Sequence, residues 1–166
     1  MPHPENVDAF GQALRQHGYE VTSDTVDGRP AVVGRRSDFR LRWMASRLHT
    51  FVVVSRFGPA GTDTGALDHF LDAACQYAVK NKEGLPRGLQ TGTAAVAVAV
   101  MDQVDGDAAA WAGHHHGRRF AALTYPVAVE TTTGRVIHPG PAVLGAIFNS
   151  HLRRVAEEIV APAARP

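Results

Sequence analysis

The sequence predicts an α+β domain whose sheet is mainly antiparallel, with about five to six strands and with helices packed largely on one face. Helical and strand patterns follow one another irregularly, in runs of strands, where a doubly wound fold would show regular strand–helix–strand units. No internal repeat, low-complexity segment or change of composition marks a boundary. We therefore expect a single domain over residues 1–166, with 161–166 as a frayed tail.

The chain opens with a predicted helix over residues 6–17. Val7, Phe10 and Leu14 recur there at helical spacing, and Gly18 supplies the stop where a left-handed residue is needed.

A meander of three or four antiparallel strands is expected over residues 19–57. Short runs of β-type residues are separated by the turn signals Asp27-Gly28 and Ser37-Asp38. Apolar and polar residues alternate around position 40, so Phe39 is predicted on a buried face together with Leu41 and Trp43.

The second half of the chain returns to helices with fewer strands between them. Asp63 predicts the N-cap of a helix that runs to about residue 81. The apolar run 94–101 has eight residues, far short of the roughly 20 that cross a bilayer as a helix, and it predicts a buried strand. The remaining elements are expected as a short helix at 107–112, a strand at 119–130, its hairpin partner at 135–140 and a helix at 141–159. This order is similar to that of small α+β chaperone-like folds, a likeness of shape that implies no site residue.

Composition limits the classes of function. A chain of 166 residues with net charge +1 has no strong overall field for nucleic acid or membranes, so we expect no membrane association. Cys75 is the only cysteine, which excludes an intramolecular disulfide, cysteine-pair zinc sites and iron–sulfur clusters. The first residues carry neither the basic nor the apolar region of a secretory signal, and a cytoplasmic location is the expectation. We expect no cofactor.

Three consecutive histidines, in the stretch "WAGHHHGRRF" at 111–120, are the most chemically conspicuous feature. Neutral imidazole binds zinc, copper and nickel, but neighbours in an extended segment point to opposite sides, so only His114 and His116 are metal candidates. The alternative is a solvated loop. Arg118 and Arg119 precede an inner strand, and with His116 they are candidate ligand-binding residues.

A glycine-rich loop, "KNKEGLPRGLQTG" at 80–92, supplies the remaining candidates for ligand binding. Lys82, Arg87, Gln90 and Thr91 offer cationic or hydrogen-bonding groups that can close on an acidic ligand or a partner protein. The alternative is a long connection whose glycines serve turns. If there is a site, we expect it at the sheet end where this loop meets residues 116–119.

Seven arginines lie between positions 29 and 56, opposed only by Asp38. Such a face can contact phosphates, but Phe39 is predicted on the opposite side, where it cannot stack on bases, so nucleic acid is not favoured. The alternative is that these arginines lie on an edge strand and block its edge-to-edge association with other sheets. These arginines are Arg29, Arg35, Arg36, Arg40, Arg42, Arg47 and Arg56.

The sequence as a whole favours a non-catalytic, cytoplasmic binding domain for a protein partner or a small anionic ligand. One alternative is an enzyme that acts on a phosphate- or carboxylate-bearing small molecule through the histidine/arginine stretch and the glycine-rich loop. A second is nucleic-acid binding through the arginine-rich strands. The long C-terminal helix suggests a homodimer.

Overall fold

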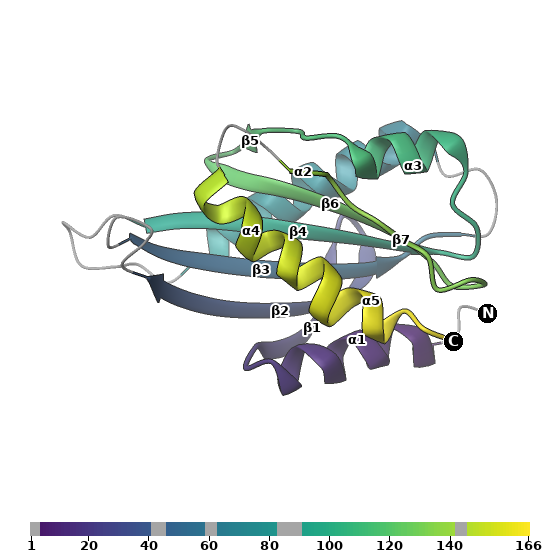
Figure 1. The fold of residues 1–166 in the computed structure, drawn as a ribbon, viewed down its shortest axis with the longest axis horizontal. Coiled ribbons are helices and arrows are strands. Elements are labelled where there is room, and N and C mark those ends of the chain that lie inside the picture. Colours follow the sequence, from purple (N-terminus) through teal and green to yellow (C-terminus); the bar gives the residue numbers. More distant parts are fainter. Residues whose placement is uncertain (1–3, 41–45, 59–62, 83–90, 142–145) are drawn as a thin grey trace.

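The computed structural model describes residues 4–40, 46–58, 63–82, 91–141 and 146–166 (Figure 1). Leu41, Trp43, Arg42, Arg87 and Gln90 lie outside these residues. The helices are α1 (Pro4–Gln16), α2 (Thr64–Asn81), α3 (Gly106–Gly113), α4 (Ala146–Arg154), the π-helical turn η2 (Val155–Val160) and α5 (Ala161–Ala163). The strands are β1 (Glu20–Val26), β2 (Arg29–Arg40), β3 (Ser46–Arg56), β4 (Thr91–Met101), β5 (Arg118–Arg119), β6 (Ala122–Glu130) and β7 (Val136–Ile137).

The strands form one seven-stranded sheet in the order β1-β2-β3-β4-β6-β5, with β7 also paired to β6. Antiparallel pairs join β1 to β2, β2 to β3, β5 to β6 and β6 to β7, which confirms the α+β class and the mainly antiparallel sheet. The centre differs from the expectation, because β3, β4 and β6 are parallel neighbours. The helices α2 and α3 make the two crossovers that parallel pairing requires.

Helices cover both faces of the sheet, not largely one (Figure 1). Residues of α2 and α3 share one buried cluster with one side of the sheet, and residues of α1, α4, η2 and α5 share the other. The physical reason lies in the central strands. Phe51 and Val53 of β3 enter the first cluster while Val52 and Val54 enter the second, so both faces need a helical cover.

The two edges of the sheet are unlike each other. Beyond β6, the short strands β5 and β7 pair with its two ends, and the hydroxyl of Tyr125 bonds to the carbonyl oxygen of Pro139 at 3.3 Å. Pro126 in β6 has no backbone N–H to offer a further strand. At the opposite edge β1 is the last strand, and most of its residues are exposed.

The chain ends more firmly than the sequence suggests. The N–H of Ala161 bonds to the oxygen of Ala156, the wide spacing of a π-helix, and Pro162 follows inside α5. Ala164 is buried in the second cluster although Pro162 is exposed, so the predicted fraying does not begin at residue 161.

The apolar side of the C-terminal helices faces this chain's own sheet, where Leu152 and Val155 are buried. The homodimer stays a prediction, and the side chains described from residue 148 onward show no uncovered apolar stripe on these helices to support it. None of the helices in the described part of the chain has the length and apolar character that a membrane crossing requires.

Phe39 is the clearest misplaced side chain. It was expected on a buried face, but it is 51% exposed near the end of β2. The reason is the length of α2, whose last residue, Asn81, lines the same groove as Arg35. Phe39 lies four residues, or roughly 13 Å, further along the strand.

Candidate functional site

The histidine/arginine stretch forms a structural junction. Arg119 lies between two carboxylates of α2, with Nη1 2.7 Å from Asp72 Oδ1 and Nη2 3.7 Å from Asp68 Oδ1. His116 donates from Nε2 to the carbonyl oxygen of Trp111 at 2.9 Å, which leaves Nδ1 to accept from Arg119 Nη2 at 3.3 Å. The Trp111 indole donates to Asp68 at 3.2 Å. These bonds fasten the segment before β6 to α2 and α3.

Among the other residues of this stretch, His114, His115 and Arg118 are exposed. His114 is the C-cap of α3, and its backbone N–H bonds to Trp111. In the described residues no group of three or more histidine, cysteine, aspartate or glutamate side chains could hold a metal ion. His114 and His116 are thus placed without further metal ligands among the described side chains.

A strained turn follows this junction. Phe120 and Ala121 have φ of 51° and 66°, and they connect Arg119 to its partner Ala122. Positive φ at both central residues is the type I′ geometry, which favours asparagine and glycine. Phe120 is 53% exposed at this tip.

The strand that follows the glycine-rich loop in sequence begins at the end of the sheet where β6 also begins. Lys82 is exposed directly after α2, and Thr91 starts β4. Since β4 and β6 are parallel, with Ala94 beside Leu123, both strands start at the same end of the sheet, and Arg118 pairs with Leu123 there. Arg87 and Gln90 fall outside the described residues, so the expected meeting of this loop with His116 stays a prediction.

The arginines of β2 and β3 are engaged with partners and do not make one free basic face. Arg36 Nη2 lies 3.0 Å from Asp38 Oδ1, Arg56 forms an ion pair with Asp102, and the Arg29 guanidinium stacks over Phe57 at 4.1 Å. Arg47 bonds to Ser37, Arg35 pairs with Glu20, and Arg40 also has an interaction partner. β3 lies inside the sheet, and β1 covers β2 as far as Arg35. Residues 36–40 of β2 extend past the end of β1, so the alternative of an arginine-guarded edge stays open for Arg36 and Arg40 alone.

A buried polar cluster lies under α4. The Nε2 atom of His151 is 3.4 Å from the Thr50 hydroxyl and 3.9 Å from Asp38 Oδ2. Burial lowers the pKa of His151, and Arg40, Arg36 and Arg154 lower it further, although Asp38 acts in the opposite direction. Both contacts reach the same ring nitrogen and Thr50 is fully buried, so this is not a relay that could activate a nucleophile.

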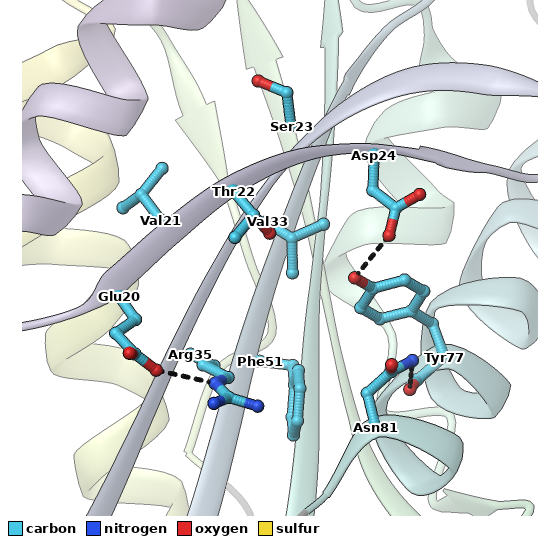
Figure 2. Close-up of a pocket in the computed structure, with 10 residues that line it drawn as sticks. All are labelled: Glu20, Val21, Thr22, Ser23, Asp24, Val33, Arg35, Phe51, Tyr77 and Asn81. Carbon is cyan, nitrogen blue, oxygen red and sulfur yellow. Dashed lines mark hydrogen bonds and ion pairs between the residues drawn. The ribbon is translucent and has the colours of Figure 1, made fainter.

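A groove lies between β1 and α2 on the described surface (Figure 2). Its volume is about 440 Å³, within the usual range for ligand pockets. The floor is apolar, with Val33 and Phe51 both buried, and Tyr77 of α2 meets Phe51 edge-on with ring centroids 6.4 Å apart. The lining residues are Glu20, Val21, Thr22, Ser23, Asp24, Val33, Arg35, Phe51, Tyr77 and Asn81.

Two polar contacts bracket the groove. The Tyr77 hydroxyl donates to Asp24 Oδ2 at 2.8 Å, and Arg35 Nε donates to Glu20 Oε2 at 2.8 Å (Figure 2). Bonds from the Thr25 N–H and then from Tyr77 lower the pKa of Asp24. Burial, followed by the contact with Asp24, raises the pKa of Tyr77. At neutral pH the groove thus presents the ionised carboxylate of Asp24 beside the buried side chains of Val33 and Phe51.

Sequence reasoning did not single out this groove. Its residues come from β1, β2, β3 and α2, which are brought together only by the sheet order. One local signal was present, because "EVTSDTV" combines β-branched residues with polar residues at both parities. A strand that is polar on both faces is typical of a sheet edge.

Comparison of the chain with protein-family models, with curated proteins and with solved structures finds no match. The similarity to chaperone-like folds therefore stays an interpretation of element order.

Proposed function

We propose that this chain is a non-catalytic, cytoplasmic binding domain for a protein partner, and that the partner binds in the groove between β1 and α2. The observation that carries the proposal is the combination of a buried apolar floor, Val33 and Phe51, with an exposed polar rim from β1. Binding sites commonly combine apolar side chains with polar groups that fix the orientation of the bound molecule, and in this groove most of the lining residues are polar.

The charges of the groove favour a protein partner over a small anion. Glu20 and Asp24 supply two carboxylates, and the cation of Arg35 already pairs with Glu20. An anion would meet net negative charge there. Arg119, one of the ligand-binding candidates from the sequence, has its charge matched by Asp68 and Asp72.

Catalysis finds little support in this groove. Its described lining contains no histidine, cysteine or lysine, the residues that most often act as base or nucleophile. Cys75 of α2 is buried, and burial raises the pKa of its thiol to about 12, so it is protonated and inert. A nucleic-acid interface is not favoured either, because the described arginines of β2 and β3 are engaged with partners of this chain.

The test is a peptide-display selection on the full chain, followed by fluorescence anisotropy of the selected peptides. Asn81→Trp fills the groove from the end of α2, and Gln76→Trp places the same side chain at an exposed position of α2 that does not line the groove. We expect Asn81→Trp to weaken binding about tenfold or more, a change of about 1.4 kcal/mol, with Gln76→Trp close to wild type. Failure to select any peptide, or equal binding by both variants, would overturn the proposal.

A further inference from the structure

The outer edge of β1 carries backbone groups that no strand of the described chain pairs. The sheet order ends at β1, and α1 and α2 lie on its two faces. An unpaired edge is a template for another strand.

Two contacts identify which residues turn their backbone groups outward. The Thr25 N–H bonds to the Asp24 side chain at 2.7 Å, and the carbonyl oxygen of Pro30, the partner of Thr25, accepts from Ser55 of β3 at 3.1 Å. The Thr25–Pro30 pair is thus not a hydrogen-bonded pair between β1 and β2. Since such pairs alternate along an antiparallel ladder, Val21 and Ser23 point their N–H and C=O groups away from β2.

β1 lacks the proline, lysine and bulge that often protect an exposed edge. The strand contains no proline and no lysine, and its register with β2 runs from Glu20–Arg35 to Val26–Arg29 without a bulge. The opposite edge, in contrast, is covered by β5 and β7 and contains Pro126. The open edge therefore lies at β1 and continues along residues 36–40 of β2, which extend past the end of β1.

The charges on β1 disfavour pairing with a second copy of this chain. The N–H of Thr25 is already bonded to the Asp24 side chain, so two antiparallel copies of β1 would pair through Val21 and Ser23 alone and be centred on Thr22. Glu20 of each copy would then lie opposite Asp24 of the other. Like charges directly opposite each other destabilise a strand pair. The same two carboxylates would attract a strand that carries cations at these positions.

We propose, on the basis of the proposed function, that the partner contributes an extended segment which adds to β1 as an antiparallel strand. The central residue of the segment lies opposite Thr22 and is a long apolar side chain that reaches over Thr22 toward Val33. Lysine or arginine stands two residues to either side, opposite Glu20 and Asp24. The residues next to the centre exchange backbone hydrogen bonds with Val21 and Ser23.

The experiment uses a fluorescent seven-residue peptide with a central leucine and lysine two residues to either side, measured by anisotropy against the full chain. We expect glutamate in place of both lysines to weaken binding about tenfold or more. N-methylation of the two residues next to leucine should abolish binding, because their N–H groups face β1, whereas N-methylation of leucine itself should leave it within about twofold.

The protein supplies a matched pair of variants. Ser23→Pro removes an outward N–H without touching the ladder to β2 and should abolish binding, and Ser23→Ala should not. Two results would show that the strand-addition inference is wrong while the proposed function stands. In the first, the leucine-centred peptide does not bind although display-selected peptides do. In the second, both N-methylated peptides bind equally well and only Asn81→Trp weakens their binding. If Asn81→Trp also has no effect on any bound peptide, both are wrong. The N-methylated peptides decide the matter even where Ser23→Pro does not fold.

Discussion

Replacing Arg119 separates a structural from a ligand-binding role for the histidine/arginine stretch. Arg119→Met keeps much of the aliphatic volume but removes the cation, so Asp68 and Asp72, four residues apart on α2, face each other without compensation. The Arg119 side chain is only 27% exposed, and it makes one contact of 2.7 Å and one of 3.7 Å. Charged hydrogen bonds in protected sites contribute about 1.5–3 kcal/mol, and exposed pairs less than about 1. For this half-buried pair we expect a loss of about 1–2 kcal/mol.

The assay is urea unfolding together with the melting temperature. For a chain of this length the loss corresponds to a fall of roughly 3–6 °C in Tm. Arg118→Met is the matched control, because Arg118 is exposed and should change stability by less than about 0.5 kcal/mol. If Arg119→Met were as stable as wild type while phosphate raised the Tm of wild type alone, Arg119 would be an anion ligand and the structural account would be refuted.

Three further predictions concern stability. Gly34→Ala should cost about 1–2 kcal/mol in urea unfolding, because its Cβ would lie 2.9 Å from a methyl of buried Leu14; no loss would show that α1 can shift. Phe120→Asn with Ala121→Gly should raise the urea midpoint by relieving about 1 kcal/mol of strain, and a lower midpoint would mean that the Phe120 side chain packs. Burial lowers the pKa of His151 in the folded chain. As the pH falls below about 6.5, His151 therefore gains its proton in the unfolded chain first, and the free energy of unfolding decreases until the pH reaches the lower pKa of the folded state. His151→Gln should flatten this acid limb of the stability–pH profile, and an unchanged limb would contradict it.

Periodicity predicted the elements well and their arrangement less well. The stops of α1 and α2 and the buried strand β4 follow from local spacing, whereas the C-terminal helical segment continues past its predicted end at 159. The parallel pairing of β3 with β4 and β6 does not, because a short crossover helix such as α3 resembles any other short helix in sequence. The placement of helices on both faces follows from that pairing.

The candidate site was less predictable than the fold. Sequence reasoning favoured charged and metal-ligating side chains. Of these, Arg119 and His116 form hydrogen bonds with other side chains of the same chain. The groove consists of ordinary residues such as Thr22 and Val33, whose importance comes from an edge position that only the sheet order defines. Charges and aromatic rings are visible in a sequence, but unpaired backbone groups are not.

Amide hydrogen exchange of β1, followed by NMR, tests the central claim most directly. The account predicts that the amides of Val21 and Ser23 exchange quickly in the free chain, that those of Thr22 and Asp24 are protected by β2, and that the leucine-centred, lysine-flanked peptide protects Val21 and Ser23. Protection of Val21 and Ser23 already in the free chain, or no change when the peptide is bound, would contradict it.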